Sequence, residues 1–109
     1  MAVAYKVLGQ SAPSATTATD AYTVPAATQT IISSIVVAER GGSAATFRIA
    51  VRPNGAALAT SHYIAYDTPV SANDVVALSL GITVDAADVV TVYASSADVS
   101  FSVFGSEVS

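Results

Sequence analysis

The sequence predicts an all-β protein: a single-domain two-sheet β-sandwich, jelly-roll-like, with about eight strands. Apolar residues recur at every second position in nearly every segment, which is the signature of strands with one buried face. Turn-forming residues interrupt these runs at intervals of roughly 8 to 15 residues. No window of useful length has a helical period. Short strands at such spacing are typical of sandwiches and jelly rolls.

The first part of the chain is predicted to hold three strands, at 2–8, 20–24 and 28–39. Residues 28–39 are apolar on both parities, so we place this strand centrally in a sheet. Residues 9–20, "GQSAPSATTATD", are low in complexity and carry only small side chains. We interpret them as an extended arm; an ordinary long loop across the sandwich end fits equally well.

Two strands are expected next, at 45–53 and 58–66, set off by turns. Paired glycines in "ERGGSAA" separate the first of them from residues 28–39, and "RPNGAA" predicts a type I turn after it. Within 45–53, alternation divides the side chains into a buried face and an outer face: Phe47, Ile49 and Val51 on the first, Arg48, Ala50 and Arg52 on the second.

The last three strands are expected at 74–82, 88–95 and 98–107, after the acidic corners "VSAND" and "VDAAD". In 74–82 one face is predicted to hold Val76, Leu78, Leu80 and Ile82. In 98–107 the inward residues are Val99, Phe101 and Val103, until Phe104 and Gly105 disturb the alternation. A glycine inside such a run indicates a bulge or a bend.

Composition sets limits on partners. The chain has 109 residues, enough for one core, and we divide it into an N-terminal strand and arm, 1–20, and a sandwich, 21–109, within one domain. A net charge of −4 has the wrong sign for nucleic acid or an anionic membrane surface, so neither is an expected partner. Only 11% of residues are charged, which is common in proteins packed into assemblies. Cysteine is absent and no apolar run is long enough to span a membrane; we expect synthesis in the cytosol.

The chain holds the residue types of a nucleophilic triad but not the arrangement. Ser61, His62 and Asp67 lie close in sequence. On a strand, Ser61 and His62 point to opposite faces, and Asp67 has the opposite parity to His62. No G-x-S-x-G nucleophile turn occurs. We therefore expect no catalytic residue and no cofactor; the rival interpretation, a small hydrolase using His62, is tested by replacing that histidine with alanine.

Three other groups of polar and aromatic residues are candidate binding sites. Asp67 with Asp74, and Asp85 with Asp88, flank corners, but no loop has the ligand density of a calcium site, so no metal is expected. For the tyrosines, stacking on sugar rings is one interpretation, and packing in the core or at an interface is the favoured one: Tyr5, Tyr22, Tyr63, Tyr66 and Tyr93. Two interpretations fit the arginines, either binding to an acidic partner or a solvent-exposed position on the outer face: Arg40, Arg48 and Arg52.

With the strands placed, residues 5 to 108 resemble a group of small all-β virion proteins of tailed bacteriophages, including cyanophages. The resemblance is carried by "YTVP" at 22–25, the glycine-rich turn at 41–42, "YD" at 66–67 before "PVSAND", Asp88 leading into "VVTVYAS", and the terminal "FGSE". These are patterns of turns and apolar strands, without a catalytic signature.

The resemblance implies a non-enzymatic structural protein of the virion, a capsid decoration or cement protein on the outer head surface. Its expected partners are the major capsid protein and further copies of itself, as a dimer or trimer. We expect the contacts in segment 1–20 and at exposed residues, namely Tyr5, Arg40, Asn54 and Tyr63. The alternative is a tail-fibre or baseplate-associated module that binds other virion proteins or host-surface saccharide; its tyrosines should then gather on one exposed face.

Overall fold

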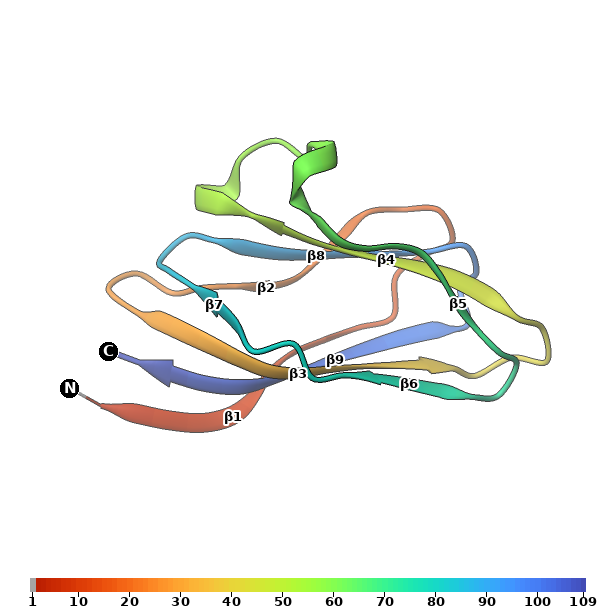
Figure 1. The fold of residues 1–109 in the computed structure, drawn as a ribbon, viewed down its shortest axis with the longest axis horizontal. Coiled ribbons are helices and arrows are strands. Elements are labelled where there is room, and N and C mark those ends of the chain that lie inside the picture. Colours follow the sequence, from red (N-terminus) through yellow and green to blue (C-terminus); the bar gives the residue numbers. More distant parts are fainter. Residues whose placement is uncertain (1) are drawn as a thin grey trace.

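The computed structural model describes residues 2–109, which form two antiparallel sheets packed face to face (Figure 1). The first sheet has the order β1 (Val3–Ser11), β9 (Val99–Val108), β3 (Gln29–Glu39) and β6 (Val75–Leu78), and β7 (Ile82–Val84) also pairs with β3. The second has the order β2 (Thr19–Thr23), β8 (Val89–Ala94), β4 (Ala45–Arg52) and β5 (Tyr63–Val70). The predicted two-sheet sandwich is confirmed.

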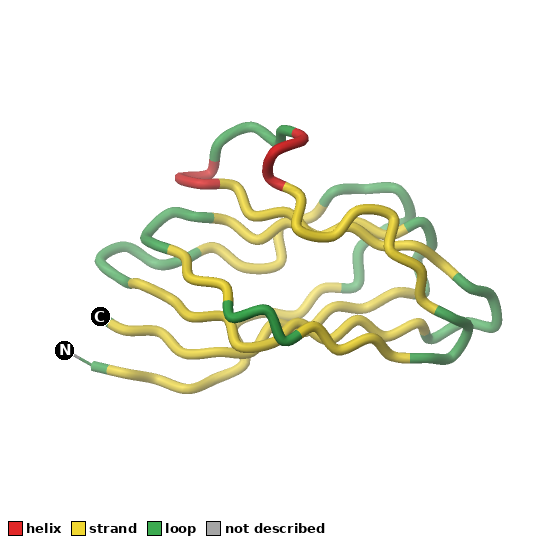
Figure 2. Tube along the Cα trace, viewed as in Figure 1, coloured by secondary structure: helices red, strands yellow, loops and turns green. Residues whose placement is uncertain are grey.

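The strand order is that of a jelly roll. If β6 and β7 are taken as one interrupted strand, the first strand pairs with the last, the second with the next to last, and so inward to the β4–β5 hairpin. The other connections cross from one sheet to the other at the ends of the sandwich (Figure 2). Within residues 2–109, no helix has the length and apolar character needed to cross a membrane.

The core between the sheets is built from small and β-branched side chains. Phe47 of β4 and Phe101 of β9 meet at its centre edge to face, with ring centroids 6.1 Å apart, so one aromatic pair joins the two layers. Valine and isoleucine side chains that are almost fully buried surround this pair: Val24, Ile32, Ile35, Val37, Ile49, Val70, Val90, Val92, Val99 and Val103. Branched side chains of this kind fill the space between two pleated surfaces well.

The alternation predicted from the sequence holds in much of β4, and in β3 it is interrupted by a register shift between Ile32 and Ser34. In β4, Phe47 and Ile49 are buried and Arg48 and Arg52 lie on the outer face, but Ala50, predicted on the outer face with the arginines, is buried as well. Strand β3, apolar on both parities, lies between β9 and the β6–β7 edge, as expected for a central strand. Because the parity changes at this register shift, Ile32, Ile35 and Val37 face the core, and Ile31, Val36 and Ala38 lie on the outside of the first sheet.

The predicted strand at 74–82 is wrong in its middle. Gly81 has a φ of 61°, in the left-handed region that glycine favours, and the chain breaks there into β6 and β7. Leu80, predicted to face inward with Val76 and Leu78, is therefore exposed. The predicted strand at 58–66 is also wrong in its first part, because a 3-10 turn, η2 (Thr60–His62), precedes β5 at Tyr63.

The turn after β4 also differs from the prediction. Asn54 and Gly55 both have positive φ, 54° and 67°, and the N–H of Ala56 donates to the carbonyl of Pro53. This is the conformation of a type I′ turn, whose two left-handed positions favour Asn-Gly, and not of the type I turn that the proline indicated. The turn forms the 3-10 segment η1 (Pro53–Gly55).

Gly105 does mark an irregularity, but the extra residues lie in the neighbouring strands. β1 shifts register between Val7 and Gly9, and β3 shifts between Ile32 and Ser34, both next to this part of β9. A Cβ on Gly105 would lie 2.0 Å from the carbonyl oxygen of Ile31. The glycine therefore permits a close approach of two backbones.

Residues 9–20 follow the loop interpretation rather than that of a free arm. Gly9 to Ser11 complete β1, residues 12–18 cross from the first sheet to the second, and Thr19 begins β2. Within the crossing, Pro13 is buried and the N–H of Thr16 donates to the carbonyl of Ala94. These contacts fix the segment to the end of the sandwich.

A polar group joins the two sheets near the chain termini. The hydroxyl of Tyr22 on β2 donates to Glu107 Oε2 on β9 at 2.6 Å and lies 2.8 Å from Thr30 Oγ1 on β3. Lys6 Nζ on β1 lies 2.6 Å from Glu107 Oε1. Burial first and Glu107 second raise the pKa of Tyr22 to about 12, and the bonds from Lys6 and then Tyr22 lower the pKa of Glu107.

Candidate functional site

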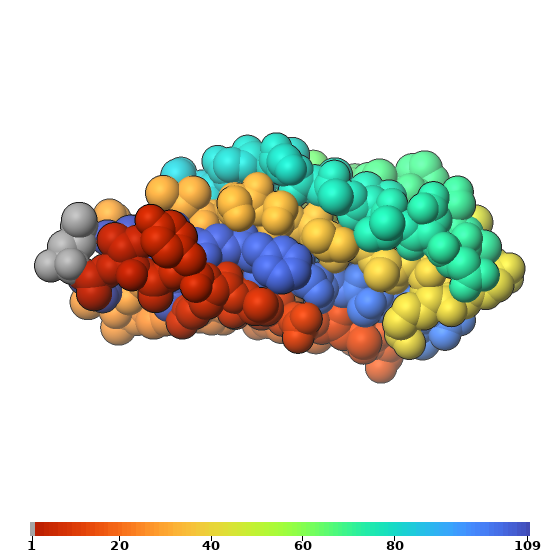
Figure 3. All heavy atoms as spheres, turned by 90° about the horizontal axis from the view of Figure 1, so that it is seen from below, coloured from red at the N-terminus to blue at the C-terminus, as the bar shows by residue number. Residues whose placement is uncertain are grey.

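The outer face of the first sheet carries no charged side chain among the described residues. The sheet's three charged residues, Lys6, Glu39 and Glu107, lie opposite inward-facing positions of the neighbouring strands. The outward side chains, here named the charge-free face, are Val3, Tyr5, Val7, Gln10, Gln29, Ile31, Ser34, Val36, Ala38, Val75, Ala77, Thr83, Ser100, Ser102, Phe104, Ser106 and Val108. Figure 3 views the molecule from this side, with β1, β9, β3 and β6 next to one another.

Large apolar side chains are exposed across the charge-free face. Tyr5 is 85% exposed and Val75, near the opposite edge, is 56% exposed. Val3, Val7 and Ile31 are each about half exposed. Serines of β9 separate them. Exposed apolar groups of this size, gathered on one face, are typical of a surface that another protein covers.

The outer face of the second sheet is different: it carries a cluster centred on Arg48. The guanidinium lies between two tyrosine rings, 4.2 Å from the centroid of Tyr66 and 4.3 Å from that of Tyr93. Tyr63 packs edge to face on Tyr66, with centroids 4.9 Å apart and ring planes at 82°. Arg48 Nε donates to Asp67 Oδ1 at 2.7 Å. These five residues are named the tyrosine–arginine cluster.

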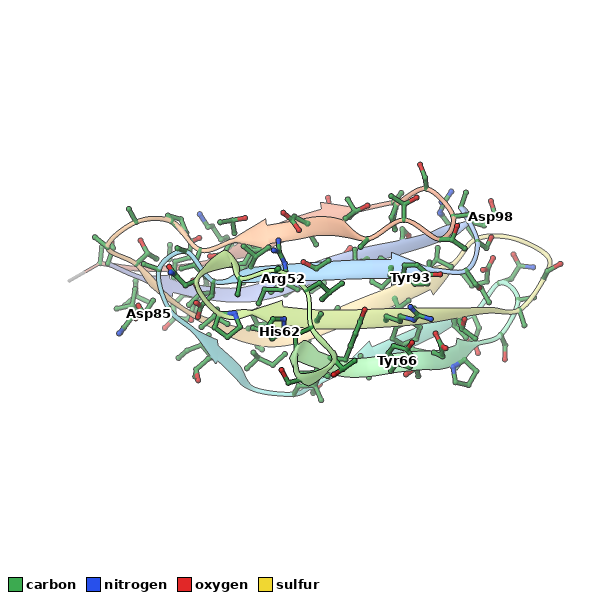
Figure 4. The ribbon with its side chains drawn as sticks, turned by 90° about the horizontal axis from the view of Figure 1, so that it is seen from above. Arg52, His62, Tyr66, Asp85, Tyr93 and Asp98 are labelled. Atoms are coloured by element: carbon green, nitrogen blue, oxygen red, sulfur yellow. The ribbon has the colours of Figure 1, made fainter. Side chains whose placement is uncertain are left out.

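Three adjacent strands bring the cluster together. Arg48 is on β4, Tyr93 is its partner on β8, and the other members are on β5 at the sheet edge (Figure 4). β5 changes register against β4 in this region, and Asp67 has a φ of 48°. The irregular backbone places Tyr66 and Asp67 on the same side, where regular alternation would separate them. Asp67, through its hydrogen bond first, raises the pKa of Arg48 further above its ordinary value.

The second arginine of this face is also paired. Arg52 Nη2 donates to Asp20 Oδ1 at 2.9 Å and its Nε to Thr91 Oγ1 at 3.0 Å. Arg52 Nη1 donates to the carbonyls of Gly55 and Ala56, which holds the turn after β4. The prediction that Arg48 and Arg52 share a face is confirmed. Each has a carboxylate of its own, so the face presents no unpaired positive charge from these two residues.

A shallow hollow of about 520 Å³ adjoins the cluster, lined by Thr60, Tyr63 and Tyr66. The two rings, nearly perpendicular, form its walls, and Thr60 belongs to η2 beside them. The hollow is thus bordered by two aromatic residues and by one residue that carries an aliphatic hydroxyl. A surface of this kind can pack against an apolar molecular face and bond to its hydroxyl groups.

Two of the three residue types of a nucleophilic triad, His62 and Asp67, have other hydrogen-bond partners. His62 Nδ1 accepts a hydrogen bond from the N–H of Ala59 at 3.1 Å, within η2. The carboxylate of Asp67 is paired with Arg48. Ser61 lies exposed next to His62 in the same turn. In this arrangement neither His62 nor Asp67 serves as the partner that a serine nucleophile needs.

The aspartates of the acidic corners accept hydrogen bonds from backbone N–H groups. Asp88 accepts the N–H of Asn54 and the N–H of Asp85, at 2.7 and 2.8 Å, which fixes the corner before β8 next to the turn after β4. Asp74 accepts the N–H of Val75. In the described part of the chain, no group of three or more histidine, cysteine, aspartate or glutamate side chains is arranged to hold a metal ion.

The four predicted contact residues lie on different surfaces. Tyr5 is on the charge-free face and Tyr63 on the opposite sheet. Arg40 lies in the β3–β4 turn and Asn54 in the turn after β4, at the two ends of β4. A single flat interface that includes Tyr5 therefore leaves the other three outside it. The sequence pattern does not predict the charge-free face, because Ile31 has the opposite parity to Val36 and Ala38 and joins them on one face only through the register shift in β3.

No family model, no curated protein and no solved structure gives a significant match to this chain. These comparisons therefore do not support the expected resemblance to phage virion proteins, and the function is argued below from the two faces.

Proposed function

We propose that the protein is a non-enzymatic structural protein of a tailed-phage virion, a decoration or cement protein bound to the outer surface of the head. The observation that carries the proposal is the charge-free face. The pattern of turns and strands that resembles phage virion proteins, and the jelly-roll order that many viral capsid proteins share, support the choice of partner.

The charge-free face suits a large protein partner. It extends along the longest dimension of the molecule, 45 Å, and across the shortest, 19 Å, measured over Cα atoms (Figures 1 and 3). A specific interface buries about 800 Å² on each partner, which a face of these dimensions can provide. Charged side chains lose hydration when an interface forms, so a face without them is covered at lower cost.

In this proposal the major capsid protein covers the charge-free face, and Tyr5 is the principal anchor. Tyrosine is enriched among residues that dominate binding energies, and Tyr5 is the most exposed large apolar side chain described. Association of decoration subunits as dimers or trimers would place several such faces on one capsid, so that modest contacts add to firm attachment. The second sheet, with its tyrosine–arginine cluster, then faces outward.

The first test is the copy number and position of the protein in purified particles, by quantitative mass spectrometry of separated heads and tails. Hundreds of copies with heads support the proposal. A few copies with tails would overturn it in favour of the tail-fibre or baseplate alternative, which the gathering of three tyrosines on one face favours. Absence from both fractions would show that the protein is not part of the virion and would also overturn the proposal.

The second test is Tyr5→Glu, which places a charge at the centre of the proposed anchor. We expect at least a tenfold loss of binding to heads assembled without the protein, measured by co-sedimentation, because the new carboxylate must be desolvated. Leu58→Glu is the matched control, since Leu58 is exposed but lies in the η1–η2 loop, outside the charge-free face. Equal binding of the two variants would show that heads do not contact this face.

A further inference from the structure

We propose that the corner formed by Thr60, Tyr63 and Tyr66 on the outer face of the second sheet binds a neutral saccharide. The site is defined by the hollow that these three residues line and by the neighbouring Asp67. It does not depend on the charge-free face or on where the protein sits in a particle.

The tyrosines are held before any ligand arrives. Tyr93, Arg48, Tyr66 and Tyr63 are in contact in that order across three strands: Arg48 lies 4.3 and 4.2 Å from the centroids of Tyr93 and Tyr66, and the rings of Tyr66 and Tyr63 meet edge to face at 4.9 Å. Arg48 is fixed in turn by two hydrogen bonds to Asp67, at 2.7 and 3.4 Å. A ring fixed in this way loses little conformational entropy when a ligand packs against it.

The chemistry of the corner fits a sugar ring. One face of a pyranose carries C–H groups, which pack on an aromatic ring, and its rim carries hydroxyls, which need hydrogen-bond partners. Tyr63 and Tyr66 supply two ring walls at 82° to each other. Thr60, which carries a hydroxyl, borders the hollow, and Asp67 Oδ2 accepts only the longer of the two bonds from Arg48. The carboxylate retains acceptor capacity toward a ligand hydroxyl.

Charge argues for a neutral ligand. The positive charge of Arg48 is matched by Asp67 at the site, and the chain as a whole has a net charge of −4. An anionic sugar would meet repulsion from the whole molecule and find no unpaired cation in the cluster. A quaternary ammonium ligand would need the space between Tyr66 and Tyr93, which Arg48 already fills.

The test is a titration with neutral oligosaccharides, using an array of glucose, galactose, mannose and N-acetylglucosamine oligomers and then the best of these in solution. The chain has no tryptophan, so its intrinsic fluorescence reports on the five tyrosines, and stacking on Tyr66 should change it. We expect saturable binding to at least one oligomer, with uronic-acid oligomers at least tenfold weaker. No saturable binding to any neutral oligomer overturns the proposal.

Variants locate the site. Tyr66→Ala should weaken binding at least tenfold, while Tyr5→Ala, which removes an exposed tyrosine from the opposite sheet, should leave it unchanged. Because Tyr66→Ala also exposes Arg48, a second variant keeps the contacts of Arg48: Thr60→Lys fills the hollow from η2 and should weaken binding similarly. Binding that survives Thr60→Lys, or that falls equally with Tyr5→Ala, would place the saccharide elsewhere and overturn the assignment.

Discussion

Gly105 shows how one missing side chain permits the close packing of two strands, β9 and β3. It lies in β9 between two neighbours, and a Cβ there would be 2.0 Å from the Ile31 carbonyl oxygen and 3.0 Å from the Ile32 Cα. These are backbone atoms, which cannot swing away as the end of a flexible side chain can. The close approach therefore requires glycine at this position.

We predict that Gly105→Ala lowers the free energy of unfolding by about 1–3 kcal/mol or more, because β9 must separate from β3 to accommodate the methyl group. Gly42→Ala is the matched control: no atom lies within 4 Å of its added Cβ, and we expect a change within about 0.5 kcal/mol. Urea unfolding followed by far-UV circular dichroism measures both. Equal stability of the two variants would contradict the close approach.

The positions of some residues could be predicted from the sequence and those of others could not, for a physical reason. The disturbance at Gly105 and the outward position of Arg48 follow from alternation along one strand, which depends only on local order. The contact between Arg48 and Tyr93 depends on register between strands, and the sequence pattern does not set which strands are neighbours. Tyr66 and Asp67 reach the same side only through an irregular backbone at a residue other than glycine.

At the scale of elements, four strands from both sheets meet in one polar group. Lys6 of β1, Tyr22 of β2, Thr30 of β3 and Glu107 of β9 are joined by hydrogen bonds and an ion pair. The group closes the sandwich near the chain termini, where the edge strand β1 has only β9 as its partner within the sheet. Deleting residues 2–18, which an arm would tolerate, would instead remove β1 and Lys6.

The same group predicts a loss of stability at alkaline pH. Burial and Glu107 raise the pKa of Tyr22 to about 12 in the folded protein, from 10.0 in its ordinary state. A raised folded pKa means that its contribution is present below pH 10.0 and is lost as pH rises toward about 12. A shift of this size corresponds to at most about 3 kcal/mol.

Urea unfolding at a series of pH values from neutral to 12 measures this loss. We expect Tyr22→Phe to lower stability at neutral pH by about 1 to 3 kcal/mol, because Glu107 loses a donor, and to flatten the decline above pH 10.0. Tyr5→Phe, at an exposed position, should keep the decline of the native chain. A decline of the same size in Tyr22→Phe would assign the alkaline transition to another group.

The division of one predicted strand into β6 and β7 marks the limit of pattern reading at this scale. Val76, Leu78 and Ile82 do face inward as alternation requires. The break comes from the left-handed backbone at Gly81, and a glycine in the sequence is compatible with either a continuous strand or a turn. The prediction of a two-sheet fold is correct despite such errors, because it depends on the number and burial of the strands rather than on where each strand ends.

At the scale of the whole molecule, the two sheets present chemically different surfaces on opposite sides. One is without charge and broadly apolar; the other has two arginine–aspartate pairs and three tyrosines. The core of the sandwich lies between them, and Figures 3 and 4 view these two sides. A protein bound to a particle through the first face leaves the second free.

This arrangement predicts that the two binding functions are separable. Tyr5→Glu should lose attachment to heads and keep the affinity for a neutral oligosaccharide, and Tyr66→Ala should do the reverse. Because the two residues lie on opposite sheets and share no contacts, the double variant should combine both losses without interaction. Co-sedimentation with heads and fluorescence titration, carried out on all four proteins, give the full cycle. If Tyr66→Ala released the protein from heads, the head would contact the second sheet, and the assignment of the outward face would have to be reversed.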